Sequence, residues 1–337
     1  MTRQRVRLLG LGLLLALTGC ASAGPAPEPT PAPPPVSPFA GATLWVDEQS
    51  TAQREADKLR EKGDDAAAAA LGPITSQPVA TWFSGQEDNP YQQAERVTTE
   101  AAAQGKLPVL VAYHRPGRDC GSYSAGGSSD AETYLQWTGQ LAAGVGDRPA
   151  VVVLEPDAVA QAATGACTTP EQAEADYAML AQAVDVLKKQ PNLRVYLDAG
   201  HSDWVGDKET LAKALQASGL ERADGFALNV SNFQSTADSV AYGESLSPLL
   251  GRPTQFVVDV SRNGQGTPQG VEGIDAWCNP PSAGLGDNPR LVEGPALSVA
   301  LLWIKEPGAS DGDCRPGEPA AGTFWPTYAR SLIEQRS

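Results

Sequence analysis

Short apolar runs alternate with helical stretches along most of the chain, and this alternation constrains the fold more than any other feature. Most of the runs are rich in β-branched residues and almost continuously apolar, as in strands that are buried on both faces. They lie at Thr43–Val46, Val79–Trp82, Leu107–Tyr113, Ala150–Leu154, Arg194–Leu197, Gly225–Val230, Gln255–Val260 and Leu297–Ile304.

Stretches with helical spacing separate these runs. They lie at Glu48–Lys62, Tyr91–Gln104, Asp130–Ala143, Glu171–Lys189, Lys208–Ala217 and Thr236–Leu249. Uninterrupted strand–helix alternation predicts an α/β fold with a parallel sheet, and seven or eight such units predict a closed or nearly closed (β/α) barrel. A doubly wound open sheet is the alternative. No G-x-G-x-x-G motif follows the first strand, so a dinucleotide site has no support.

The N-terminus has the pattern of an export signal. Three arginines among the first seven residues precede the apolar stretch 8–17, which is too short to span a bilayer. The next residues, Leu17-Thr18-Gly19-Cys20, resemble a bacterial lipobox, in which the cysteine is acylated and becomes the mature N-terminus. Ordinary cleavage near residues 21–23 is the alternative. Acylated Cys20 would hold the protein at a membrane surface as a cell-surface lipoprotein.

Eight prolines lie between residues 25 and 38, a density that favours an extended polyproline II spacer. We therefore predict a lipoprotein signal peptide over 1–19, a spacer over 20–37 and one folded domain over 38–337. The net charge of −15 argues against nucleic acid or anionic lipid as a partner. We expect a monomer that meets the membrane only through its lipid.

Five cysteines are present, and four remain if Cys20 carries a lipid. An even number in an exported chain indicates two disulfides, for which three pairings are possible. The chain has no C-x-x-C pair and only two histidines, His114 and His201, so a zinc site has little support. We expect neither a metal nor a cofactor.

Polar residues follow nearly every predicted strand, and in parallel barrels these strand ends face one side. The residues are Asp119, Glu155, Asp157, Asp198, Asn229, Asp259 and Asp311. Asp157 or Asp198 alone could be a helix N-cap. Taken together, the series predicts a cleft rich in aspartate.

At these positions the chain resembles glycoside hydrolase family 6, the cellulases of the endoglucanase and cellobiohydrolase II type. The segments that carry the resemblance run in family order at 38–41, 117–120, 152–157, 196–202, 225–232, 259–264, 275–279 and 305–312. They include Glu155-Pro156-Asp157 and Asp198-Ala199-Gly200-His201. The resemblance covers the chain from about Pro38 to its C-terminus and implies a distorted parallel barrel.

The resemblance also implies inverting hydrolysis of β-1,4-glucosidic bonds. Asp157 matches the general acid, and Asp119 matches the neighbouring carboxylate that raises the pKa of the acid. Asp311 is the candidate base; alternatively it is a loop carboxylate paired with an adjacent cation, Arg315 or Lys305. Asp198 would orient the acid, and Tyr113 would lie under the reacting sugar ring.

Further positions match sugar contacts. Trp82, Trp204 and Trp277 are candidate aromatic platforms. Lys305 and Asn229 resemble hydroxyl-binding groups, Ser124 is the nearest match to a serine beside the attacking water, and His201 is more often structural than catalytic. The family's disulfides would be Cys120–Cys167 and Cys278–Cys314.

The sequence departs from the family pattern in places. Ala309 stands where bacterial members usually have Glu, and His114-Arg115 is more basic than usual. The segments 264–276 and 315–326 are short, which favours an open cleft and endo action. The rival hypothesis is a lipid-anchored cello-oligosaccharide-binding protein or an inactive family member.

Overall fold

The computed structural model describes residues 33–85 and 89–336. The signal peptide, Cys20 and most of the proline-rich spacer lie outside the described residues. The residues from Pro34 onward belong to one compact unit. In the part of the chain that the structure describes, no helix is long and apolar enough to cross a membrane.

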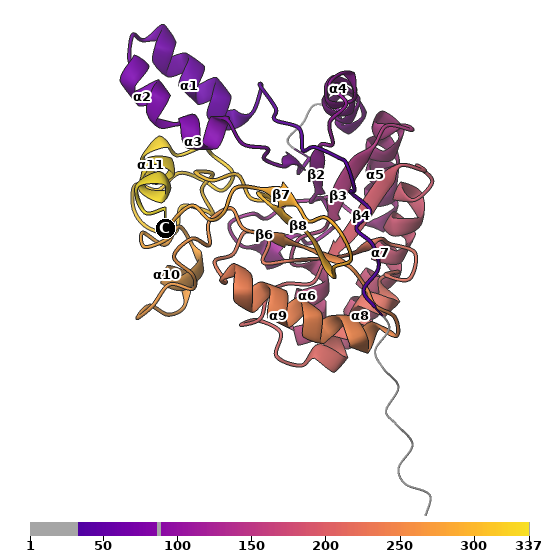
Figure 1. Ribbon diagram of the computed structural model, residues 1–337. Coiled ribbons are helices and arrows are strands. Elements are labelled where there is room, and N and C mark those ends of the chain that lie inside the picture. The colour runs from indigo at the N-terminus through magenta and orange to yellow at the C-terminus, as the bar shows by residue number, and fades with distance from the viewer. Residues whose placement is uncertain (1–32, 86–88, 337) are drawn as a thin grey trace, which may run out of the picture. The chain divides into compact units, whose positions relative to one another are not determined.

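One curled sheet forms the centre of this unit (Figure 1). Its strands are β1 (Thr81–Phe83), β2 (Val109–Ala112), β3 (Ala150–Leu154), β4 (Leu193–Asp198), β5 (Gly225–Leu228), β6 (Phe256–Asp259), β7 (Arg290–Leu291) and β8 (Ser298–Leu302). The order is β1-β2-β3-β4-β5-β6-β8-β7, and every neighbouring pair is parallel except β7–β8.

The sheet nearly closes between β1 and β8. Val79 forms a parallel bridge with Trp303, and the Ala80 N–H donates to the Trp303 carbonyl at 2.9 Å. The Trp82 indole adds a bond to the Ile304 carbonyl at 2.8 Å. The predicted α/β fold, a distorted and mostly parallel barrel, is therefore confirmed.

Helices connect the strands. They are α1 (Thr51–Glu61), α2 (Asp65–Ala70), α3 (Gly72–Thr75), α4 (Pro90–Ala103), α5 (Ala131–Val145), α6 (Ala158–Thr164), α7 (Pro170–Leu187), α8 (Lys208–Ala217), α9 (Thr236–Leu246), α10 (Ile274–Trp277) and α11 (Pro326–Glu334). Local sequence sets many of their starts: Asn89, Asp130 and Asp207 accept from the N3 backbone N–H, and Thr169 forms a capping box with Gln172.

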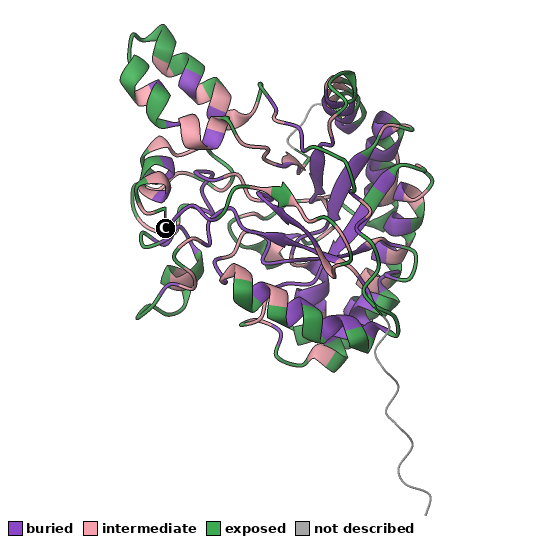
Figure 2. Ribbon diagram, in the orientation of Figure 1, coloured by how far each residue is buried: buried purple, intermediate pink, exposed green. Residues whose placement is uncertain are grey.

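Two apolar layers stabilise the barrel. Val111, Val153 and Val257 belong to a cluster without helical residues, which places them inside the barrel. Leu110 and Val152, their neighbours along the strands, pack in a second cluster with helix residues. Figure 2 shows most of the strands buried, with β7 as an exception, and the outer faces of the helices exposed. Burial on both faces explains the continuous apolar runs.

Several predicted elements differ from the structure. The run Thr43–Val46 forms only a single bridge, Leu44 to Leu107, instead of a strand. The antiparallel β7 and the helices α2, α3, α6, α10 and α11 were not predicted. Most of these elements are short, so their periodicity is weak and tertiary contacts decide their conformation.

Candidate active site

Three carboxylates lie buried at the C-terminal ends of strands: Glu155 after β3, Asp198 at the end of β4 and Asp259 at the end of β6. Each accepts backbone N–H groups from neighbouring loops. Glu155 accepts from His114 and Arg115, which follow β2, at 2.9 and 3.2 Å. This carboxylate therefore joins the loop after β2 to the loop after β3.

Asp198 and Asp259 act in the same way. The Asp157 N–H donates to Asp198 at 2.8 Å, which connects the loop after β3 to β4. Asp259 accepts the N–H groups of Ser231 and Lys305, both at 2.9 Å, and so connects the loops after β5 and β8 to β6. Buried carboxylates thus define the conformation of most loops at this end of the barrel.

The same loops contain residues in the left-handed region of backbone conformation. The non-glycine residues with positive φ are Asp119, Cys120, Glu155, Asp157, Asn229, Ser231 and Asn279. This conformation costs free energy for residues with a Cβ and persists only where the surroundings enforce it. Its concentration at one end of the barrel marks that end as the functional one.

Asp157 lies directly after β3, partly exposed at this end. Burial of the carboxyl and the negative charge of Asp119 raise its pKa from 3.8 to about 7, against the opposing influence of Arg115 and Lys305. A carboxyl with this pKa can donate a proton near neutral pH.

Asp119 occupies the loop after β2 with φ of 56°. Its carboxylate accepts the Ser124 N–H at 2.6 Å, and it is partly exposed. Burial raises its pKa, whereas the Ser124 N–H and Arg118 oppose that shift. Asp119 and Asp157, which follow the adjacent strands β2 and β3, therefore form a pair of electrostatically interacting carboxyls.

Asp198 is only 1% exposed. Burial and the charge of Asp157 raise its pKa well above the ordinary value. Its second oxygen, Oδ1, is buried without a hydrogen-bond partner among the described residues. Asp198 thus fixes the backbone of Asp157.

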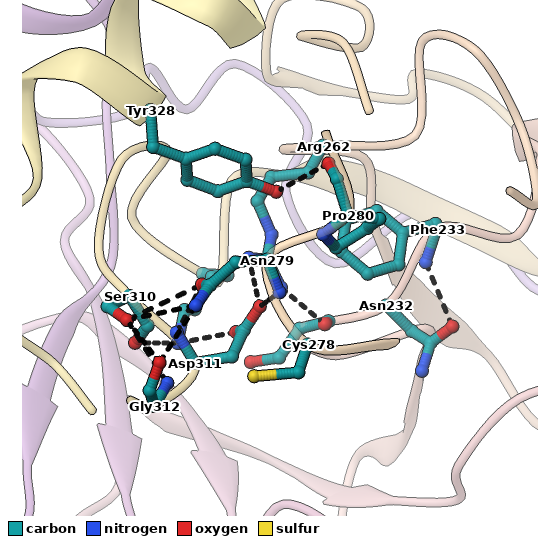
Figure 3. Close-up of polar contacts among 12 residues, drawn as sticks. Asn232, Phe233, Arg262, Cys278, Asn279, Pro280, Ser310, Asp311, Gly312 and Tyr328 are labelled. Carbon is teal, nitrogen blue, oxygen red and sulfur yellow. Dashed lines mark hydrogen bonds and ion pairs between the residues drawn. The ribbon is translucent and has the colours of Figure 1, made fainter. Parts of the chain in front are cut away.

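The pKa of Asp311 is shifted in the opposite direction to that of Asp157. Figure 3 shows the polar contacts of Asp311. Its carboxylate pairs with Arg262 at 2.8 Å and with Lys305 at 3.1 Å, and it accepts the Asn279 N–H at 3.0 Å. Burial acts to raise its pKa, but Arg262 and Lys305 hold that pKa below the ordinary value. Between the ordinary pKa of an aspartate, 3.8, and about pH 7, Asp311 is therefore ionised while Asp157 keeps its proton.

The alternative pairing of Asp311 with Lys305 is present, together with a second pairing to Arg262. The pairing with Arg315 is absent, because Arg315 instead binds Asp275 at 2.8 Å and Glu318 at 2.7 Å.

Arg262 and Asn279 were not predicted as site residues, although both lie in motifs that resemble the family. Arg262 is fully buried, stacks over Phe233 at 4.5 Å and donates to the Ser231 carbonyl at 2.6 Å. The Asn279 side chain accepts the Asp311 N–H at 2.7 Å and donates to the Gly312 carbonyl at 2.9 Å (Figure 3). Both residues position Asp311.

A cavity of about 420 Å³ is lined by Ser124 and Lys305, which contact Asp119 and Asp311 respectively. The carboxylates Asp119, Asp157, Asp198 and Asp311 are not themselves part of its lining. Four predicted residues line it: Trp82, Tyr113, Ser124 and Lys305. The Trp82 and Tyr113 rings meet edge to face at 5.4 Å, and the Lys305 amine lies 5.9 Å from the Trp82 ring. Apolar ring faces beside a few polar groups suit a sugar, which presents both C–H faces and hydroxyls.

Asn229 is fully buried, so the prediction that it binds a substrate hydroxyl does not fit the structure. Its amide donates to the Gln234 and Asp259 carbonyls at 3.2 and 2.8 Å, and its oxygen accepts the Gln234 N–H at 3.0 Å. The sequence does not reveal whether such an asparagine is buried or exposed, because the same loop motif is compatible with both.

Three other predicted contacts lie outside the lining of the cavity. Trp204 packs beside His201 with ring centroids 5.8 Å apart. Burial lowers the pKa of His201 to about 4, against the effect of Asp203, so the ring is neutral at pH 7. Trp277 is 41% exposed and lies 6.0 Å from the Tyr123 ring.

The disulfides Cys120–Cys167 and Cys278–Cys314 are both present, with Cα atoms 5.8 and 6.5 Å apart. They lie next to Asp119 and Asp311, respectively. The group of possible metal ligands found among the described residues consists of Cys278, Cys314 and Glu318, and the disulfide occupies both of its sulfurs.

Comparisons with known proteins agree with this geometry. The family model described as "Glycosyl hydrolases family 6" matches residues 39–336. Endoglucanase 1 of Streptomyces halstedii is 39% identical over 297 residues, 86% of this chain and 88% of that protein. Endoglucanase A of Cellulomonas fimi is 42% identical over 266 residues, 78% of this chain and 56% of that protein.

Solved structures of similar proteins show the same architecture. The endoglucanase Cel6 of Mycobacterium tuberculosis, solved with a thio-linked cellobioside ligand, is 38% identical with a TM-score of 0.81. The match covers 89% of this chain and 99% of that one. The endoglucanase CEL6B of Humicola insolens is 25% identical with a TM-score of 0.73, over 89% and 99% of the two chains.

Proposed function

The chain belongs to glycosyl hydrolase family 6, and from that premise we propose that it hydrolyses internal β-1,4-glucosidic bonds of cellulose or a related β-glucan. The observation that carries the proposal is the contrast between Asp157 and Asp311. The pKa of Asp157 is raised to about 7, whereas two cations hold the pKa of Asp311 low. A glycosidase needs one carboxyl of each kind.

In this mechanism Asp157 donates its proton to the oxygen of the departing sugar. The O–H bond to that oxygen forms as the bond between the oxygen and the anomeric carbon breaks. Asp119 keeps the proton on Asp157 until it is needed, because two neighbouring carboxylates resist joint ionisation. Asp198 holds the backbone of Asp157 in its left-handed conformation through the bond at 2.8 Å.

A water molecule attacks the anomeric carbon from the opposite face, so the configuration at that carbon is inverted. We propose that Asp311, ionised and held by Arg262 and Lys305, accepts the water proton directly or through a second water. Asp119 and Ser124, joined by their hydrogen bond of 2.6 Å, would help to orient the attacking water.

Substrate contacts extend along the loops at this end of the barrel. Tyr113 and Trp82 would pack against sugar faces near the reacting bond, and Lys305 would bind a hydroxyl. Trp204 and Trp277, which lie outside the cavity, would support more distant sugars. We do not extend this role to Asn229, because its side chain is buried and bonded to its own loop.

The decisive experiment follows products of the purified protein on a soluble β-1,4-glucan by NMR. An inverting enzyme releases the α-anomer first. Asp157→Ala should abolish that release, whereas Asp203→Ala, at an exposed position, should retain it. Early β-anomer would contradict the mechanism, and binding of cello-oligosaccharides without cleavage would favour a binding protein.

A separate experiment tests whether the enzyme cleaves internal bonds of the glucan. The relatives reported above are called endoglucanases, and the segments 264–276 and 315–326 are short. On carboxymethylcellulose, we expect viscosity to fall steeply while few reducing ends form. Viscosity that falls only in proportion to soluble cellobiose would indicate action from chain ends.

A further inference from the structure

The cavity extends beyond Trp82 and Lys305 to the start of helix α1. Its lining there includes Gln49, Thr51, Arg54, Arg96 and Glu306. Three small residues, Ala309, Ala321 and Gly322, also line the cavity. This end is therefore polar and charged, unlike the aromatic part near Tyr113, and small side chains leave room in it.

The two arginines at this end are in different electrostatic states. Arg96 is paired with Asp47 and Glu100, each at 3.0 Å. Within residues 33–85 and 89–336, Arg54 donates to uncharged acceptors, the Gln49 carbonyl and the Thr51 hydroxyl. Among the described residues, no carboxylate lies within ion-pair distance of Arg54. A guanidinium has five donors, so further donors of Arg54 are available to a ligand.

Glu306, the carboxylate that interacts with Arg54 electrostatically, forms its hydrogen bond with another group. Glu306 interacts with Arg54 beyond ion-pair distance, and its oxygen accepts the Ala52 N–H at the first turn of α1 at 2.9 Å. The Arg54 guanidinium thus has no ion-pair partner among the described residues, although the protein has a net charge of −15. Arg54 is an exposed residue that lines this end of the cavity, so its guanidinium can attract an anionic group of a ligand bound there.

We propose that this end of the cavity binds a carboxylate carried by the glucan, such as a glucuronosyl unit in a β-1,4-linked chain, and that Arg54 selects it. A carboxylate can accept two parallel N–H bonds from one guanidinium, which a hydroxyl cannot. The inference rests on the proposed function and specifies which substituted substrate the same site takes.

The test compares cello-oligosaccharides of equal length, neutral or with one C6 group oxidised to a carboxylate. Arg54→Gln should lower kcat/KM for the acidic substrate by about tenfold, the size of one charge-assisted contact, and leave the neutral substrate unchanged. Arg60→Gln is the matched control, because Arg60 lies on the same helix and pairs with Asp57 at the surface. Added salt should weaken only the preference for the acidic substrate.

Ala309→Glu provides a second variant, since it adds a negative charge to the same cavity and should disfavour the acidic substrate selectively. Equal effects of Arg54→Gln on both substrates, or none on either, would overturn the inference. If neither substrate is cleaved, the proposed function fails instead. Calorimetric binding of the two oligosaccharides to the wild type and Arg54→Gln then decides the inference by itself.

Discussion

At the scale of single residues, the local environment shifts the pKa values of two carboxyls of the site in opposite directions. Asp157 and Asp311 have the same side chain, yet burial and Asp119 keep the first protonated while Arg262 and Lys305 keep the second ionised. The cations around Asp311 come from the loops after β6 and β8, so the effect of Arg262 depends on tertiary structure rather than on local sequence.

Arg262→Lys should shift the acidic limb of the pH–rate profile. The lysine retains a charge but loses the planar fork that binds Asp311 at 2.8 Å and the Ser231 carbonyl at 2.6 Å. The pKa of Asp311 then rises, so kcat/KM should begin to fall at a higher pH than in the wild type. Arg290→Lys, at an exposed ion pair, is the control. An unchanged acidic limb would argue against Asp311 as the base.

Asp157→Asn should change how stability depends on pH. The folded-state pKa of about 7 exceeds the unfolded value of 3.8, so the folded wild type binds more protons in between. Its stability therefore falls as pH rises from about 4 to 7. The variant lacks this loss, and its Tm should exceed that of the wild type by about 2 °C or more at pH 8. A Tm difference that is the same at pH 4 and pH 8 would contradict this assignment.

At the scale of elements, the strand ends are joined by buried carboxylates rather than by the strands alone. Asp259 accepts four backbone N–H groups from the loops after β5, β6 and β8, at 2.9 to 3.2 Å. One of those groups belongs to Lys305, which pairs with Asp311. Asp259 thus holds the loops of the barrel together and also fixes the backbone of Lys305, which binds Asp311.

Asp259→Asn should therefore impair both folding and catalysis. Asparagine offers one acceptor and places an N–H₂ donor against backbone donors, which leaves buried groups unsatisfied. We expect a loss of about 2–4 kcal/mol in the free energy of unfolding, measured by denaturant titration, and a lower kcat. Asp287→Asn, which alters an exposed carboxylate, should do neither. Wild-type kcat in Asp259→Asn would exclude the positioning role.

Element prediction succeeded where the pattern was long and regular. Helix α8 and strand β3 coincide with their predicted ranges, because capping by Asp207 and a continuous apolar run are local signals. The first apolar run failed as a strand, since only Leu44 finds a partner in the sheet. The antiparallel β7 is two residues long and depends wholly on its pairing with β8.

At the scale of the whole molecule, the N-terminal signal stays a prediction, because residues 1–32 lie outside the described part of the chain. We propose that Cys20 is acylated and that the proline-rich spacer connects it to the folded domain. The lipid would keep the enzyme at the cell surface, close to the products that it releases.

Cys20→Ser should release the enzyme from membranes. In cells that express the full chain, a palmitate analogue should label the wild type, and the protein should sediment with membranes. The variant should carry no label and appear in the medium with unchanged specific activity. Unlabelled wild-type protein in the medium would favour ordinary cleavage near residues 21–23.

The sequence by itself determined the alternation of the longer strands and helices and the positions of the carboxylates at strand ends, and the family resemblance implied the disulfide pairing. Periodicity and capping encode the elements, whereas the disulfide pairing follows only from the resemblance to the family. Only the tertiary structure decided that Asn229 is buried, that Arg262 pairs with Asp311 and that Arg54, which lines the cavity, has no ion pair among the described residues. Burial and ion pairing depend on groups far apart in the chain, and closure of the barrel brings those groups together.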